Sequence, residues 1–136
     1  MKIIKLLSFL LFAGIILSCS KDEESIRLSK DTMYISNSGG SDTIKVLNYK
    51  NVRLTGEAEV HMNDSIYWVS SYQSGLYQDM FSVDGDWFKI TVPDKAPNMI
   101  VATVDGSKLN PNDKWSISMG IANADVYSRI EIKTKN

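Results

Sequence analysis

The sequence predicts an all-β fold of the sandwich class. From Ser25 onward, apolar residues alternate with polar ones at a period of two, which is the spacing of a strand with one buried face. Turn-forming residues separate these runs at intervals of about 8–12 residues, and no stretch has the period of a long amphipathic helix. Roughly eight to ten short strands in this arrangement are typical of two packed sheets.

Two strands are expected near the start of this region. Met33 and Ile35 share one face of the first strand, and Ile44 and Val46 share one face of the second. The segment 37–41 between them contains two adjacent glycines, which adopt positive φ at no steric cost. We therefore expect a hairpin at residues 37–41.

The middle of the chain continues the pattern. Ala58, Val60 and Met62 are in register on one strand, Asn63-Asp64 breaks that run, and residues 66–69 form a short apolar strand. The segment 99–104 is continuously apolar, which predicts a strand covered on both faces or an edge strand that another segment covers. The inward-facing residues of the later strands are expected to be Phe88, Ile90 and Val92, then Trp115, Ile117, Met119 and Ile121, then Ile130 and Ile132, with a terminal hairpin at 123–125.

The N-terminus has the features of a secretory signal peptide. Lys2 and Lys5 form a positive region, residues 3–17 are almost entirely apolar, and small residues lead to Cys19, the only cysteine of the chain. The apolar run is shorter than the roughly 20 residues that a membrane-spanning helix needs. An ordinary signal peptide with an incidental cysteine is the simpler alternative to the lipid anchor described next.

The residues Ile16-Leu17-Ser18-Cys19 resemble the lipobox of bacterial lipoproteins. That resemblance implies cleavage before Cys19 and acylation of Cys19, with palmitate among the expected chains, so that the protein contacts the membrane through a lipid anchor. The acidic run 20–24 resembles the export signal of Bacteroidetes surface lipoproteins; a solvated tether is the alternative, and the two are compatible. The expected division is a signal peptide at 1–18, an acylated tether at 19–25 and one domain at 26–136.

Composition limits the possible functions. Cleavage after residue 18 leaves 118 residues with 13 basic and 16 acidic side chains, so the mature chain has a net charge of −3. This length is enough for one domain with a real core. The mild and dispersed negative charge argues against nucleic-acid binding. Acylation of Cys19 would leave no cysteine for a disulfide.

A second resemblance involves the domain itself. Leu28-Ser29, Met33-Tyr34-Ile35 and the 39–46 segment resemble the start of BACON-type immunoglobulin-like domains of Bacteroidetes lipoproteins. Tyr67-Trp68-Val69-Ser70 and the closing run 128–132 are similar to later parts of those domains, whereas residues 105–113 look like an insertion. The resemblance implies an immunoglobulin-like β-sandwich on a cell-surface lipoprotein of the outer membrane.

Catalysis is the minority hypothesis. His61 is the only histidine and is expected on a strand without a nucleophile turn, which disfavours a catalytic triad and a histidine-rich metal site. No phosphate-binding glycine loop occurs. Asp84-Gly85-Asp86 and the 110–113 segment have oxygen ligands for calcium, but turn formation explains both. A small hydrolase would need a cleft with several carboxylates, so we expect no enzyme, no cofactor and no metal.

An aromatic segment supplies the candidate ligand-binding residues. Aromatic rings stack on the apolar faces of sugars, and neighbouring amides and hydroxyls bond to sugar hydroxyls. Trp68 is expected to be a core residue rather than a ligand platform, because it lies within a strand. Binding and simple loop packing both remain open for the two later tyrosines. The candidates are Tyr67, Trp68, Tyr72, Gln73 and Tyr77.

The sequence therefore predicts a non-catalytic outer-membrane surface lipoprotein. Its expected role is that of a carbohydrate-binding accessory module in polysaccharide utilisation, with a glycan as ligand. The alternative is a structural or adhesin-like module that binds an outer-membrane protein partner in a cell-envelope complex.

Overall fold

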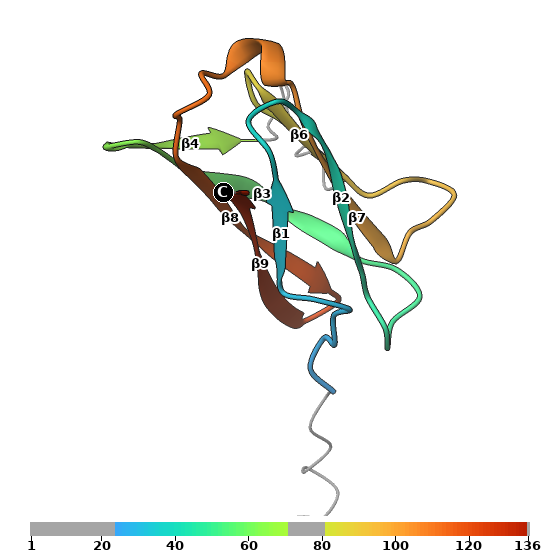
Figure 1. The fold of residues 1–136 in the computed structure, drawn as a ribbon. Helices are drawn as coiled ribbons and strands as arrows, with labels where there is room; N and C mark the ends of the chain where they lie inside the picture. The colour runs from blue at the N-terminus through green and yellow to red at the C-terminus, as the bar shows by residue number, and fades with distance from the viewer. Residues whose placement is uncertain (1–23, 71–80, 136) are drawn as a thin grey trace, which may run out of the picture.

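The computed structural model describes residues 24–70 and 81–135, and these residues form nine strands in two facing sheets (Figure 1). The five-stranded sheet has the order β1-β9-β8-β3-β4, and the four-stranded sheet has the order β2-β7-β6-β5. The bounds are β1 Thr32–Ile35, β2 Gly40–Lys45, β3 Arg53–Met62, β4 Ser65–Ser70, β5 Ser82–Asp84, β6 Phe88–Thr91, β7 Met99–Val104, β8 Trp115–Asn123 and β9 Val126–Thr134, with a 3-10 turn η1 at Gly106–Lys108.

The strand order is that of an immunoglobulin-like sandwich. The chain crosses between the sheets after β1, β2, β4 and β7, so that strands adjacent in sequence are often not adjacent in a sheet. The pair β8–β9 and the strand β3 lie together, opposite β2, β7 and β6, as in domains of this class. The predicted fold class is confirmed.

One core fills the space between the sheets. The predicted inward positions of β6, β8 and β9 are all buried, as are those of β1 and β2. Because the buried cluster runs from Ile26 to Ile132, a chain beginning at Ser20 keeps every core residue and is expected to fold alone. The confirmed inward residues are Met33, Ile35, Ile44, Val46, Ala58, Val60, Phe88, Ile90, Val92, Trp115, Ile117, Met119, Ile121, Ile130 and Ile132.

The predicted hairpin at 37–41 is wrong. β1 pairs in parallel with β9, whereas β2 pairs with β7 in the other sheet, so the glycines make a crossing between sheets. Gly39 and Gly40 have φ of 98° and 143°, and Gly39 passes close to Gly106. The alternation of apolar and polar residues predicts which side chains of a strand are buried, but it does not predict which other strand pairs with it.

The expectation for residues 99–104 also needs correction. β7 lies between β2 and β6 and buries only one face, with Ile100, Ala102 and Val104 inward. Thr103 is exposed, and Met99 and Val101 are partly buried. The apolar run reflects a central strand with one covered face.

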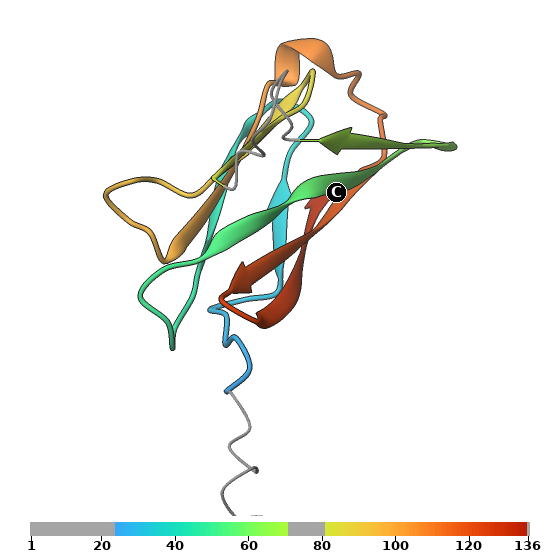
Figure 2. The same cartoon turned by 180° about the vertical axis from the view of Figure 1, so that it is seen from behind.

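The predicted terminal hairpin is confirmed, and the predicted break at Asn63-Asp64 is the turn of a second hairpin. β8 and β9 join at Asn123–Val126, where Ala124 has φ 47°, and β3 and β4 join through Asn63-Asp64, where Asn63 has φ 51°. Both views show the β3–β4 hairpin extending beyond the rest of the sandwich (Figures 1 and 2).

Candidate functional site

An irregularity in β3 shapes the outer face of the five-stranded sheet. Leu54 pairs with Ile121 and Ala58 pairs with Met119, so three residues of β3 lie opposite the single residue Gly120 of β8. Gly56, in the middle of this bulge, has φ 94°, which an L side chain rarely adopts. Bulges of this kind redirect side chains and are common next to functional sites.

Gly120 leaves the centre of this face without a side chain. The Thr55 hydroxyl donates a hydrogen bond to the Gly120 carbonyl oxygen at 3.1 Å. A Cβ atom placed on Gly120 would lie 2.6 Å from the Thr55 hydroxyl oxygen, which is closer than real contacts allow. The bulge and the glycine therefore produce a local depression in the sheet surface.

The depression is an open hollow of about 560 Å³ with an aromatic ring on each side. Trp68 reaches it from β4 and Tyr127 reaches it from β9, and these side chains are 59% and 63% exposed. The remaining lining residues supply hydroxyl, carboxylate and guanidinium groups and backbone atoms. They are Thr55, Glu57, Gly120, Ser128 and Arg129.

Polar contacts hold two arginines around this hollow. The Nε of Arg129 donates a hydrogen bond to the Ser118 hydroxyl at 3.0 Å. The guanidinium of Arg53 lies over the Tyr127 ring, 5.8 Å from its centroid, and donates to the Ala124 carbonyl at 3.1 Å. The Tyr127 ring is thus supported on one side by a cation, and Arg129 is fixed in direction.

The same face continues into a neighbouring hollow. This smaller space, of about 220 Å³, is lined by Asp31, Thr32, Ser118, Arg129 and Glu131. Arg129 therefore separates two hollows on one sheet surface. Both contain acidic and basic groups, so neither presents a single sign of charge.

His61 lies on β3 of this sheet, as expected from the sequence. Its Nε2 atom is 2.5 Å from Oε1 of Glu59, and its register partner on β8 is Ser116. Within residues 24–70 and 81–135, no three His, Cys, Asp or Glu side chains gather where they could hold a metal ion. In the same residues, no helix has the length and apolar character to span a membrane.

The structure separates the two predicted ligand residues that it describes. Trp68 pairs with Glu59 and points outward, whereas Tyr67 pairs with the buried Val60 and points inward. The Tyr67 hydroxyl accepts a hydrogen bond from the indole Nε1 of Trp87 at 2.8 Å. Tyr67 therefore fastens β4 to the other sheet and is not part of the hollow.

The expectation that Trp68 is a core residue is wrong. Trp68 lies on the outer face of an edge strand, and no other described residues form a layer over that face. The candidates Tyr72, Gln73 and Tyr77, and the proposed anchor Cys19, lie outside the described residues.

Several lining residues of the hollow were missed, most clearly Tyr127, Arg129 and Gly120. Gly56 gave a usable signal, because a glycine inside a strand pattern often marks a bulge. Tyr127 and Arg129 are separated by one residue, which places them on one face of β9. Two strands, β8 and β3, separate β9 from β4, and local patterns could not predict that side chains of β9 and β4 line the same hollow.

Comparisons with known proteins identify no family for this chain. No family model matches it, and no curated protein matches it. A solved structure similar to it is the M1 domain from titin, with a TM-score of 0.44 and 8% sequence identity over 82% of this chain and 94% of that one.

Proposed function

We propose that this protein is a non-catalytic binding module that holds a carbohydrate on the outer face of its five-stranded sheet. The observation that carries this proposal is the hollow between the exposed rings of Trp68 and Tyr127. Rigid aromatic rings offer apolar stacking surfaces, and the polar groups between them offer hydrogen bonds in fixed directions. A sugar ring needs both kinds of contact.

The charge pattern supports an uncharged polar ligand. Glu57 and Arg129 both line the hollow, and Glu131 lies in the neighbouring one. A polyanion such as nucleic acid requires a basic surface, which this face does not provide. The hydroxyl groups of a neutral saccharide can donate hydrogen bonds to a carboxylate and accept them from a guanidinium.

A glycan microarray followed by calorimetry tests this function on the soluble chain beginning at Ser20. Trp68→Ala and Tyr127→Ala should each weaken binding to the selected glycan at least about tenfold, because each removes a stacking surface. Tyr34→Ala is the matched control, since Tyr34 is an exposed tyrosine outside the hollow, and it should change affinity less than about twofold. Absence of binding to every glycan, or equal losses in all three variants, would refute the proposal.

The sequence candidates that follow β4 form a separate arm of this test. Tyr72→Ala and Tyr77→Ala are expected to weaken the same glycan if their segment contributes to binding, and Gln73→Ala tests a hydrogen bond from the same segment. Unchanged affinity in all three variants would restrict the site to the sheet face.

The proposed place of action is the outer membrane, with the domain displayed at the cell surface. Support comes from the lipobox at Ile16-Leu17-Ser18-Cys19 and the acidic run that follows it. Metabolic labelling with a palmitate analogue should label the native chain and not Cys19→Ala, and protease added to intact cells should digest the labelled protein. Labelling that persists in Cys19→Ala would refute the anchor.

A protein-interaction module of a cell-envelope complex is the second candidate function. The observation that favours it is the exposed edge of β4, where Ile66 is 63% exposed. Extended segments of partner proteins bind such edges by adding a strand. A stoichiometric partner recovered from outer-membrane extract, together with no affinity for sugars, would favour this function over the first.

A further inference from the structure

The sequence of β4 lacks the residues that usually protect an outer strand. Natural sheets guard their edges with charges, prolines, bulges or very short strands. β4 spans six residues, Ser65–Ser70, and contains no charged residue and no proline. The outward side chains Ile66 and Trp68 are 63% and 59% exposed.

The other outer strands among the described residues are short or covered. β1 has four residues and β5 has three. The edge of β2 is partly covered. The Ser29 backbone N–H donates to the Lys45 carbonyl, the Ser29 hydroxyl accepts from the Lys45 N–H, and the Asp42 carboxylate accepts from the Thr43 N–H. At Ile66 and Trp68, β4 therefore offers a hydrogen-bonding edge that no described residue covers.

The register of the β3–β4 hairpin shows which backbone groups face outward. Met62 and Ser65 flank the two-residue loop and form a hydrogen-bonded pair, and such pairs recur at every second residue. The intervening residues, Ile66 and Trp68, consequently point their N–H and C=O groups away from β3. These groups have no partner among residues 24–70 and 81–135.

This edge is complementary to itself. In an antiparallel pair, residues directly opposite each other must lie on the same face of the sheet. A two-fold axis at Tyr67 places Ile66 opposite Trp68 of a second copy, and Trp68 opposite Ile66 of that copy. All four side chains then lie on the outer face, and about four backbone hydrogen bonds join the two edges.

We propose that a second copy of this chain pairs antiparallel along β4, so that two five-stranded sheets become one continuous sheet. Pairs of an aromatic and a β-branched residue stabilise neighbouring strands, and the contact contains two of them. No like charges oppose each other, because the strand has none. An unrelated peptide could use the same backbone groups, but it would have to supply this apolar pattern, which a second copy already has.

The pairing is independent of the proposed carbohydrate function, although it has a consequence for it. Trp68 lies both at the edge and beside the hollow. The dimer would bring two hollows onto one surface, which raises the avidity for a repeating polymer without new contacts.

Sedimentation velocity over a range of concentrations tests the pairing on the soluble chain beginning at Ser20. The chain should show a concentration-dependent monomer–dimer equilibrium, and Ile66→Lys should raise the dissociation constant at least about 100-fold by placing charges in the contact. Because Ile66 is exposed, this variant should fold normally. Tyr34→Lys, on the opposite edge, should dimerise like the natural sequence.

A single cysteine tests the register. The soluble chain has none, since Cys19 is absent from it. Tyr67→Cys places two thiols opposite each other at the two-fold axis, in a closely spaced pair without hydrogen bonds, and should form an intermolecular disulfide on oxidation. Val69→Cys separates the two thiols and should form little disulfide under the same conditions.

The possible results separate this inference from the carbohydrate proposal. Ile66→Lys should lose the dimer and keep glycan binding to a monosaccharide-sized ligand, while Tyr127→Ala should lose the glycan and keep the dimer. A chain that stays monomeric at millimolar concentration, a dimer unaffected by Ile66→Lys, or a monomer that captures a different protein on β4 would overturn the pairing with a second copy.

Discussion

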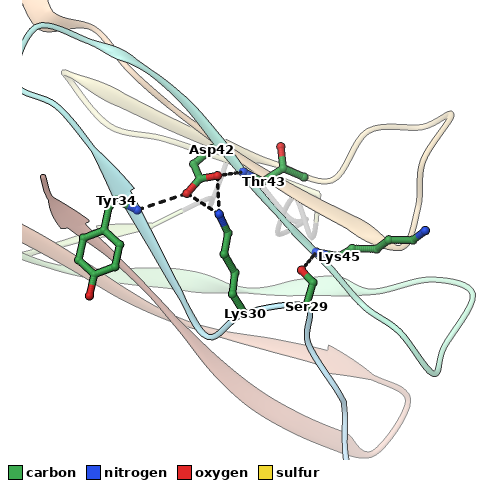
Figure 3. Close-up of polar contacts among 6 residues, drawn as sticks. All are labelled: Ser29, Lys30, Tyr34, Asp42, Thr43 and Lys45. Carbon is green, nitrogen blue, oxygen red and sulfur yellow. Dashed lines mark hydrogen bonds and ion pairs between the residues drawn. The ribbon is translucent and has the colours of Figure 1, made fainter.

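The two edges of the five-stranded sheet differ in how their backbone groups are satisfied. At the β1 edge, the carboxylate of Asp42 from the other sheet accepts a hydrogen bond from the Tyr34 N–H at 3.3 Å (Figure 3). At the β4 edge, the corresponding groups of Ile66 and Trp68 have no partner in the described part of the chain. One edge is closed by a charged side chain, and the other presents apolar side chains to solvent.

The closed edge depends on a small polar cluster. The Lys30 ammonium donates to both oxygens of Asp42, at 2.6 and 2.7 Å, and the Thr43 N–H donates to one of them at 2.8 Å (Figure 3). Partial burial opposes ionisation of Asp42, but the hydrogen bonds from Lys30, Thr43 and Tyr34 outweigh it and lower the pKa of this carboxyl. An ionised acid at a sheet edge both satisfies the edge and repels a further strand.

The contrast teaches that one sheet can have two unlike edges. A polar side chain satisfies the backbone groups of one edge, and the backbone groups of the other stay available to a partner. β4 and β2 each span six residues, yet among the described residues polar side chains bond to the outer edges of β1 and β2 and not to Ile66 or Trp68 of β4. Three predictions test whether the two edges differ as the contacts indicate.

Among the changes that act on the two edges, the largest effect is expected where the chain crosses from β1 to β2 and brings Asp42 over the closed edge. Gly106 packs against this crossing so closely that a Cβ atom there would lie 2.2 Å from the backbone of Ser38. Gly106→Ala should lower the free energy of unfolding by about 2–3 kcal/mol, because backbone atoms cannot move aside cheaply. Urea denaturation measures this loss.

Ser107→Ala is the neighbouring control for that change. It removes a hydroxyl that bonds to Asp105 in the same turn but adds no atom to the crossing, so its cost should stay below about 1 kcal/mol. Equal stabilities for Gly106→Ala and the natural chain would show that the crossing is loose and that the closed edge does not depend on it.

Local patterns predicted the core of this fold and its terminal hairpin, but they failed to predict the partners of β1 and β2. Ile117 and Ile132 could be assigned inward positions because a strand has a period of two. The period does not show whether the strand after Gly40 pairs with β1 or joins the opposite sheet. That choice depends on packing between residues far apart in the sequence.

The candidate site likewise combines residues that could be selected from the sequence with an arrangement that depends on long-range packing. Trp68 could be selected from its residue type, but its exposure depends on the position of β4 as an outer strand of its sheet. Tyr127 was overlooked because nothing in residues 123–129 indicates that Trp68 faces the same hollow. The glycine of the bulge, Gly56, was the only local sign of the irregularity that forms it.

A smaller effect is expected at the acidic cluster of the closed edge. Asp42→Asn should cost about 1 kcal/mol near pH 7, since the partly exposed Lys30 pair is screened by solvent and the amide still accepts hydrogen bonds. The contribution has a defined pH dependence. Because the folded pKa of Asp42 lies below its ordinary value of 3.8, the stabilisation is present above about pH 4 and is lost as the pH falls through the folded pKa.

Thermal unfolding between pH 7 and pH 2 measures this dependence. The difference between the natural chain and Asp42→Asn should shrink as the pH falls below about 4. Asp31→Asn changes an exposed acid next to β1 and serves as the control. Its stability below about pH 4 should fall in nearly the same way as that of the natural chain. A difference that stays constant down to pH 2 would mean that the charge of Asp42 contributes nothing to the closed edge.

The smallest effect on stability is expected at the open edge. Trp68→Ala should change the free energy of unfolding of the monomer by less than about 0.5 kcal/mol, since its ring is 59% exposed on an outer strand. Trp115→Ala removes a ring that is 4% exposed and bonded to Asn37, and it should cost about 3–5 kcal/mol. Urea denaturation at low protein concentration compares the two. A large loss in Trp68→Ala would place this ring in the core after all, whereas a folded variant that has lost dimer and glycan binding would show that the open edge keeps its tryptophan for contacts outside the domain.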